Sequence, residues 1–196
     1  RGHPLESGVH LNELTCASSV GVVEALLPGG PARSRVAMGT RSVGGFSGQF
    51  KTLAAEVQKS LLPQESPTIP GLDVAGKIVT CDEIGGDYFD FLHDMECPTD
   101  SFGIVVGDVT GHGVDAALIM TTARAFLRMR ASQCGSIAQI ITEMNRHLAQ
   151  DILATGRFVT LFYMTIDARQ KCLRWVRAGH DPAILYDPDR DVFEEL

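Results

Sequence analysis

Two aspartates lie next to apolar segments and have no basic residue nearby in the sequence. Asp108 follows the apolar run at residues 104–106, and Asp87 stands directly before a segment with strand-like composition. No lysine or arginine occurs between Lys77 and Arg124, although acidic residues are frequent there. A carboxylate at the end of a buried strand without a protein cation must take up a proton or meet a bound cation. Hard divalent ions prefer such oxygens, so the pair is a candidate metal site. The alternative is two turn-forming aspartates, one of which caps the next helix.

The segment after Asp108 could bind an anion and move a proton. Residues 109–113 read Val-Thr-Gly-His-Gly and lie between a predicted strand and a predicted helix. A helix N-terminus offers free N–H groups and a partial positive charge, so Gly111 and Gly113 are candidates for a loop that receives a substrate anion. His112 is a candidate catalytic residue, because a histidine at this junction can donate or accept a proton. An ordinary structural or solvated histidine is the alternative.

The elements that position these residues follow from hydrophobic periodicity. Apolar residues at helical spacing predict helices over residues 48–62, 113–131 and 136–152. Apolar runs and alternation predict strands over residues 72–81, 87–93, 102–109, 157–167, 171–178 and 182–187. Strands come in runs instead of alternating with helices, so an antiparallel α+β fold is expected.

The first part of the chain differs from the rest. Residues 1–46 contain Pro-Gly-Gly-Pro at 28–31 and show no clean periodicity. We expect a linker or the tail of an upstream element, partly disordered. The alternative is a regulatory helix, for which residues 11–27 are the candidate. Residues 47–196 are then one domain.

Composition excludes several classes of protein. The chain has 196 residues, 44% of them hydrophobic, and a net charge of −7. A surface of that charge repels nucleic acid and anionic membranes, so neither is an expected partner. No apolar stretch approaches the roughly 18–20 residues of a membrane-spanning helix. The five cysteines are widely spaced without a Cys-x-x-Cys pair, which favours reduced thiols in a cytoplasmic protein.

Four motifs together resemble those of the bacterial PPM-type (type 2C-like) serine/threonine phosphatases. The resemblance is to the branch that holds the sigma-factor regulatory and sporulation stage II phosphatases, and it extends over about residues 48–196. The motifs are EVQKSLLP at 56–63, GGDYFDF at 85–91, GDVTGHG at 107–113 and RAGH at 177–180. The resemblance implies a central β-sandwich flanked by helices in αββα layers, with two Mn²⁺ or Mg²⁺ ions at one edge of the sandwich.

The resemblance also implies roles for particular residues. Asp108 matches the aspartate that bridges the two metal ions, Val109 would lend its backbone carbonyl, and Asp87 matches the aspartate of the first motif. A metal-bridging hydroxide would attack phosphoserine or phosphothreonine directly. The general-acid histidine of the eukaryotic type 2C enzymes lies two residues after the bridging aspartate, whereas His112 lies four residues after Asp108. His180 is interpreted as structural or as lining the rim of the site.

The family further implies partners and a longer domain. The expected substrate is a phosphorylated anti-anti-sigma protein of the STAS type, and the helix over residues 50–62 is where an upstream sensor or regulatory domain would act. A homodimer through this helix is an alternative to packing on the sandwich.

The family's later metal-binding motifs, of the Thr-Asp-Gly and Asp-Asp types, do not follow His180, and residues 186–191 form a polar turn. Residues 47–196 are therefore expected to be the N-terminal two-thirds of a phosphatase domain that lacks its C-terminal portion. A site without those later ligands would be weak, and the fragment itself is expected to be inactive or nearly so. A non-catalytic regulatory module with the phosphatase fold, which binds a partner without turnover, is the alternative function.

Overall fold

A computed structural model describes the backbone of residues 9–11, 21–26, 35–37, 48–79, 84–93, 101–167 and 170–196. Side chains are described for residues 52–79, 84–92, 101–167 and 170–196. The helices are α1 (Gly48–Leu61), α2 (Val114–Ala131), α3 (Ile137–Ile152) and the short 3-10 helix η1 (Leu153–Thr155). The strands are β1 (Val9–Leu11), β2 (Gly21–Leu26), β3 (Arg35–Ala37), β4 (Asp73–Ile78), β5 (Tyr88–His93), β6 (Ser101–Val109), β7 (Val159–Asp167), β8 (Cys172–Ala178), β9 (Ile184–Asp187) and β10 (Val192–Glu195).

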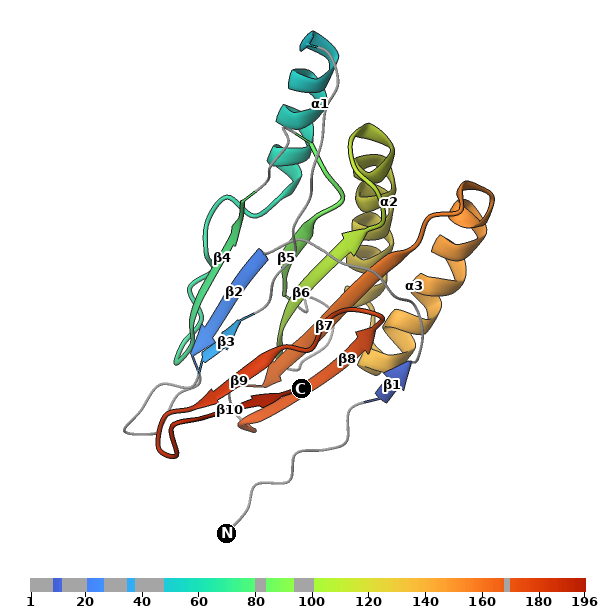
Figure 1. The fold of residues 1–196 in the computed structure, drawn as a ribbon. Helices are drawn as coiled ribbons and strands as arrows, with labels where there is room; N and C mark the ends of the chain where they lie inside the picture. Colours follow the sequence, from blue (N-terminus) through green and yellow to red (C-terminus); the bar gives the residue numbers. More distant parts are fainter. Residues whose placement is uncertain are drawn as a thin grey trace.

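A five-stranded sheet in the order β1-β8-β7-β6-β5 forms the centre of the fold. Its pairs are antiparallel except that β1 runs parallel to β8. Helices α2 and α3 lie along one face of this sheet, as Figure 1 shows. The pair β2-β4 and the group β10-β9-β3 are separate small sheets. The expected antiparallel α+β fold is therefore confirmed.

Two hydrophobic cores lie on opposite faces of the central sheet, and β6 supplies both. Val105 and Val109 belong to the core under the helices, which also holds Met120 of α2 and Leu148 of α3. Ile104 and Val106 of β6 belong to the other core, to which β4 contributes Val74. Because β6 is buried on both faces, it reads as a continuous apolar run. The described residues thus form one helical layer and two strand layers of the expected αββα arrangement.

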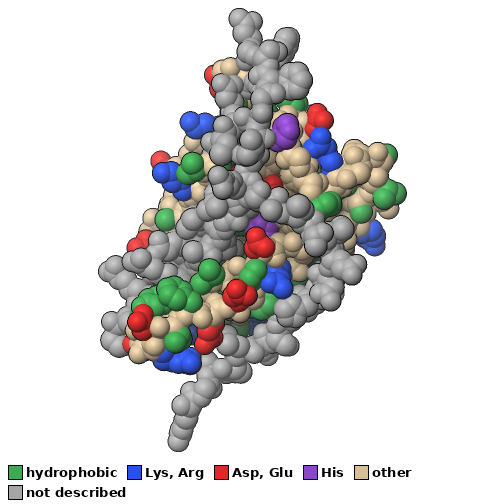
Figure 2. All heavy atoms as spheres, in the orientation of Figure 1, with side chains coloured by type: hydrophobic (Ala, Val, Ile, Leu, Met, Phe, Trp, Pro, Cys, Tyr) green, Lys and Arg blue, Asp and Glu red, His purple; other side chains and the backbone are tan. Residues whose placement is uncertain are grey.

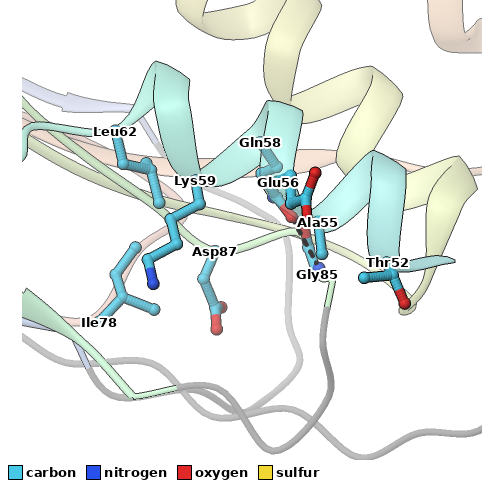
Figure 3. Close-up of a pocket in the computed structure, with 9 residues that line it drawn as sticks. All are labelled: Thr52, Ala55, Glu56, Gln58, Lys59, Leu62, Ile78, Gly85 and Asp87. Carbon is cyan, nitrogen blue, oxygen red and sulfur yellow. Dashed lines mark hydrogen bonds between the residues drawn. The ribbon is translucent and has the colours of Figure 1, made fainter.

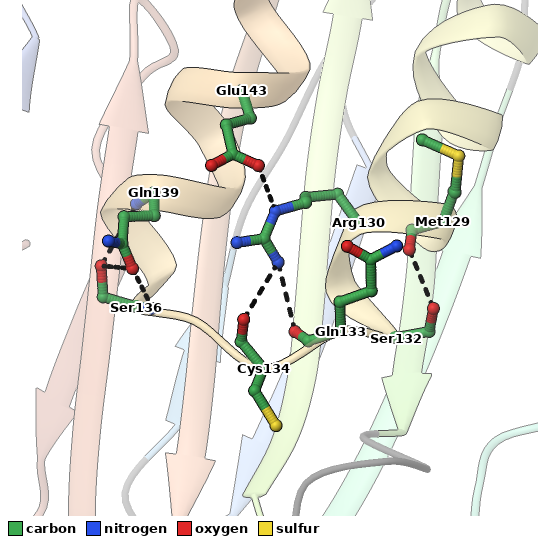
Figure 4. Close-up of polar contacts among 8 residues, drawn as sticks. All are labelled: Met129, Arg130, Ser132, Gln133, Cys134, Ser136, Gln139 and Glu143. Atoms are coloured by element: carbon green, nitrogen blue, oxygen red, sulfur yellow. Dashed lines mark hydrogen bonds and ion pairs between the residues drawn. The ribbon is translucent and has the colours of Figure 1, made fainter.

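The turn between α2 and α3 is fixed by polar contacts at both of its ends. Ser136 caps α3 in a capping box with Gln139, as a serine before an apolar run predicts. The Arg130 guanidinium forms an ion pair with Glu143 of α3 and donates to the carbonyls of residues 133 and 134 (Figure 4). These contacts hold the two helices that cover the sheet in register.

Several expectations need correction. The turn expected at residues 186–191 covers only residues 188–191, because residues 186 and 187 end β9, and it connects β9 to β10, a strand not predicted from the sequence. Strand β2, paired with β4, lies within residues 11–27, where a helix was the alternative. Strands β1 and β3 pair with β8 and β9. The rest of residues 1–46 lies outside the described part, so the division of the chain there stays a prediction. Cys134 is disulfide-bonded, so the expectation of reduced thiols is wrong for that residue, while Cys172 is free.

Part of the surface carries acidic side chains, in agreement with the negative net charge of the chain. Acidic and hydrophobic side chains gather over the β9–β10 hairpin in Figure 2. Glu194 and Glu195 are exposed there, and Phe193 is 71% exposed. Among the helices of the described residues, none is both long and apolar enough to cross a membrane.

Candidate functional site

The pairing of β5 with β6 brings Asp87 and Asp108 to the same end of the central sheet. Tyr88 is opposite Gly107 in the antiparallel ladder, so the register places Asp87, one residue further, opposite Asp108. Side chains alternate between the two faces of a strand. Both aspartates therefore lie on the sheet face away from α2 and α3, the face that carries the core without helices. Asp87 is only 4% exposed, and Asp108 is partly buried. The strands alone therefore bring the two predicted metal ligands together.

The two carboxyl groups are close enough to affect one another's ionisation. The pKa of Asp108 is raised from 3.8 to about 7, first by burial and then by the negative charge of Asp87 and a hydrogen bond with its carboxyl, against a backbone hydrogen bond from Val109 that lowers it. Among the residues that the structure describes, no basic side chain contributes to this shift of the Asp108 pKa. A cation bound between the carboxylates would relieve both the desolvation and the repulsion.

The turn before Asp87 packs directly on the backbone after Asp108. A Cβ atom at Gly86 would lie 2.6 Å from the Val109 carbonyl oxygen, which no real side chain tolerates. Glycine at position 86 therefore lets the two loops approach. The approach places the Val109 carbonyl beside the Asp87 turn.

Helix α1 holds the same turn through a side chain. The Gln58 side-chain amide donates to the Gly85 carbonyl at 2.6 Å, and the Gly85 N–H donates back to Gln58 Oε1 at 3.2 Å. Gln58 is 9% exposed although its neighbours on α1 are mostly exposed. The position of α1 is thereby linked to the backbone that leads into Asp87.

A cavity of about 420 Å³ lies between α1 and this turn. Figure 3 shows Lys59 extending from α1 on the side of the cavity where Asp87 lies, with Ile78 beside it. Leu62 and Glu56 also line the cavity. The space is large enough for a side chain of a partner to reach Asp87.

Asp90, in the same motif as Asp87, is not part of this pair. Its side chain is fully buried on the helix-facing side of the sheet, where Arg128 of α2 donates to both carboxylate oxygens at 2.7 Å. The Tyr88 hydroxyl donates to the same carboxylate, and burial raises the pKa of Tyr88 well above its ordinary value. Asp90 therefore ties β5 to α2.

The loop between β6 and α2 has the backbone shape that its glycines predict. Gly111 and Gly113 have φ angles of 94° and 77°, which favour glycine. No side chain caps α2 at Gly113, so its first N–H groups stay available. His112 is exposed, and the hydrogen bonds of the described residues include none from its ring. The structure brings no contact between His112 and either aspartate, so its catalytic role stays a prediction.

Two further groups support the site from β7 and β8. The Thr160 hydroxyl hydrogen-bonds with Nδ1 of His180 at 2.9 Å and lies 3.5 Å from the Asp108 carbonyl oxygen. Burial lowers the pKa of His180 to about 4, so the ring is neutral, and its Nε2 is buried without a partner among the described residues. His180 is thus a buried residue behind Asp108, in agreement with a structural role.

Sequence reasoning missed Gln58, Thr160 and Arg157 as supporting residues. Gln58 carried a signal, because it is polar on the helix face that also carries Ala54 and Leu61. Arg157 carried no such signal in the sequence, since the carbonyl that it binds in the β6–α2 loop lies 47 residues earlier in the chain.

The donor set fits a hard divalent cation in part. Two carboxylates and one backbone carbonyl are the ligand types that Mg²⁺ and Mn²⁺ take. The described residues contain no cluster of three or more His, Cys, Asp or Glu side chains that could hold a metal ion. These residues alone therefore offer a partial coordination shell.

Comparisons with known proteins point to one group. A family model described as "Stage II sporulation protein E (SpoIIE)" matches residues 98–196. The phosphoserine phosphatase RsbU of Bacillus subtilis is 29% identical over 144 residues, which cover 74% of this chain and 42% of RsbU. The phosphoserine phosphatase RsbP of the same organism is 30% identical over 108 residues, which cover 54% of this chain and 26% of RsbP. The chain thus spans less than half the length of these relatives.

Solved structures show the same fold. The RsbU and RsbW domains of Rv1364c from Mycobacterium tuberculosis match with a TM-score of 0.50 and 29% identity, over 57% of this chain and 30% of that one. The SiaA-PP2C domain of Pseudomonas aeruginosa matches with a TM-score of 0.56 and 21% identity, over 75% of this chain and 58% of that one. The second likeness concerns the fold alone.

Proposed function

Because the chain belongs to the stage II sporulation protein E (SpoIIE) family, we propose that it contributes to metal-dependent removal of phosphate from a phosphoserine or phosphothreonine of a partner protein. The observation that carries the proposal is the contact between the half-buried Asp108 carboxyl and the carboxyl of Asp87; burial and this contact together raise the pKa of Asp108 to about 7. A catalytic cation needs such a pair of oxygen ligands next to accessible space. The cavity beside Asp87 supplies the space.

Each site residue has a distinct part in the proposed reaction. Asp87, Asp108 and the Val109 carbonyl would hold Mn²⁺ or Mg²⁺, of which the complete domain would take two ions. When bound, the metal neutralises phosphate charge and lowers the pKa of water. Gly111 and Gly113 leave the N–H groups at the start of α2 free to receive phosphate oxygens. His112 stands on the same loop and would move a proton at the phosphate.

The proposed substrate is a phosphorylated anti-anti-sigma protein of the STAS type, acting in the cytoplasm in sigma-factor regulation. The similarity to RsbU and RsbP, both phosphoserine phosphatases by name, supports this substrate class. An upstream sensor or regulatory domain would act through α1, whose Leu53 and Val57 are 63% and 55% exposed. A second copy of the chain could cover the same residues in a homodimer.

Calorimetric titration with Mn²⁺ tests the metal site. We expect saturable binding to the wild-type chain and none to Asp108→Ala, while the control Asp189→Ala, in the exposed β9–β10 turn, binds as wild type does. Turnover of p-nitrophenyl phosphate and of a phosphorylated STAS protein then separates catalysis from metal binding. Binding that survives in Asp108→Ala would refute the site.

Failure of the wild-type chain to bind Mn²⁺ would refute a working metal site on Asp87 and Asp108 in this chain. Capture of the phosphorylated STAS protein without turnover by the complete domain would then support the non-catalytic partner-binding module instead.

A further inference from the structure

Arg157, just before β7, lies across the loop that follows Asp108. One terminal nitrogen of its guanidinium donates to the Thr110 carbonyl at 2.9 Å. The other donates to the Asp115 carboxylate, in the first turn of α2, at 3.1 Å. One side chain therefore joins both ends of residues 110–115, which contain the candidate His112 and the two loop glycines. Its own exposure is only 25%, so most of it is packed.

The guanidinium also packs against the loop backbone. A Cβ atom at Gly111 would collide with Nη1 of Arg157, so residue 111 must be glycine for the arginine to take this place. The residue after the arginine completes the attachment: Thr110 N–H donates to the Phe158 carbonyl at 3.0 Å, and Phe158 N–H donates to the Thr110 hydroxyl at 2.9 Å. The loop is thus fastened to the start of β7 by both backbone and side-chain bonds.

Arg130 makes a matching arrangement at the other end of α2. It too pairs with a carboxylate, Glu143, and donates to loop carbonyls (Figure 4). Its guanidinium also packs on a glycine, Gly135. The two arginines make the same kinds of contact at opposite ends of one helix. Only Arg157 lies beside the loop that leaves Asp108, so Arg130 provides a control that matches it in chemistry and differs in place.

We propose that Arg157 is a positioning residue for the site, which holds residues 110–113 in the shape that presents the Val109 carbonyl and the free N–H groups of α2. The part that concerns metal and phosphate rests on the proposed function. The part that concerns the loop does not, because it follows from the bonds to Thr110 and Asp115. A guanidinium is needed, since a lysine ammonium cannot reach two separated acceptors in a fixed fork.

Amide hydrogen exchange of the metal-free full chain tests the loop. In Arg157→Ala we expect the amides of residues 110–116 to exchange about tenfold faster, because the ion pair with Asp115 and the hydrogen bond to the Thr110 carbonyl are lost. Arg130→Ala should leave those amides unchanged and speed exchange around residues 132–136 instead. Arg157→Lys should fall between wild type and Arg157→Ala, and circular dichroism checks that every variant is folded.

Calorimetric titration of the same proteins with Mn²⁺ tests the site. We expect Arg157→Ala to weaken Mn²⁺ binding by about 10–100-fold, as the loss of an outer contact to a metal site does. Arg130→Ala should bind as wild type does, although it loses a comparable set of contacts. A general loss of stability would weaken both variants alike, so the difference between them reports positioning.

The outcomes separate the two claims. Unchanged exchange of residues 110–116 in Arg157→Ala would overturn the proposal, whatever Mn²⁺ does. Faster exchange with unchanged Mn²⁺ affinity would also overturn it, because the shape of the loop would then have no effect on metal binding. If wild type binds no Mn²⁺, the proposed function fails, and the exchange experiment still decides whether Arg157 holds the loop. If Arg157→Ala is unfolded, the Arg157→Lys variant carries the same comparison.

Discussion

Replacing Asp108 by asparagine should stabilise the metal-free protein at neutral and alkaline pH. The pKa of Asp108 is raised from 3.8 to about 7, first by burial and then by the charge of Asp87. Because the folded-state pKa lies above the unfolded one, stability is fully present below pH 3.8 and is lost as the pH rises to about 7. An asparagine side chain at this position would carry no charge at any pH and can donate a hydrogen bond to the Asp87 carboxylate.

The size of the effect follows from the pKa shift and the exposure of the carboxyl. A shift from 3.8 to about 7 corresponds to about 4 kcal/mol at 1.36 kcal/mol per pH unit. Asp108 is only partly buried, so solvent screening reduces this figure, and we expect about 2 kcal/mol. For a chain of this size that gain raises the melting temperature by about 4–8 °C.

Urea unfolding in the presence of a chelator measures the effect. At about pH 8 the Asp108→Asn variant should be more stable than wild type, and near pH 4 the two should be equal. Asp151→Asn, at an exposed position on α3, serves as the control and should match wild type at both pH values. Added Mn²⁺ should reverse the order, because only wild type gains free energy of unfolding from binding. A variant no more stable than wild type at about pH 8 would refute the reasoning about carboxyl repulsion.

Three other substitutions test the residues around the pair. Gln58→Ala should lower the free energy of unfolding by about 1–3 kcal/mol, because the buried N–H and carbonyl of Gly85 lose their partner; equal urea midpoints would contradict this. Gly86→Ala should lower the melting temperature and weaken Mn²⁺ binding, because its Cβ would displace the Val109 carbonyl, whereas an unchanged calorimetric affinity would show that the close approach is not needed. The pKa of His180 is lowered to about 4, so it contributes stability that is present above pH 6.5 and lost on acidification to about pH 4. Thermal unfolding of His180→Gln should therefore lack that acid-side loss, and a curve parallel to that of wild type would argue against it.

The fold was largely predictable because its buried elements have clear periodicity. Strand β6 is buried on both faces and α3 has a regular apolar stripe, and both were predicted close to their observed bounds. Strand β10 was missed because most of its residues are exposed, so it lacks a buried face that would give alternation. Strand β2 was missed because its stability depends on pairing with β4, which lies about 50 residues further on.

The site was predictable only where its residues are close in sequence to a motif. Asp87 and Asp108 each lie in a glycine-containing motif, and the structure brings them together, although their function stays a prediction. The contacts of Gln58 and Arg157 join residues 27 and 47 positions apart, and nothing local indicates such a pairing. Sequence patterns therefore indicate the charged groups, whereas the groups that hold them in place become visible only in three dimensions.

The pairing of β5 with β6 also concerns the time course of folding. Asp87 and Asp108 belong to two consecutive antiparallel strands, whereas β7 and β8 join the sheet from after α3. Any intermediate in which β5 and β6 have paired already holds the two carboxyls together, before the rest of the sheet is added. A proton, or a divalent cation if the proposed site binds one, would therefore stabilise that intermediate as well as the finished protein, and it would speed folding when this hairpin is part of the nucleus. The ion that serves the chemistry would then also act as a folding cofactor.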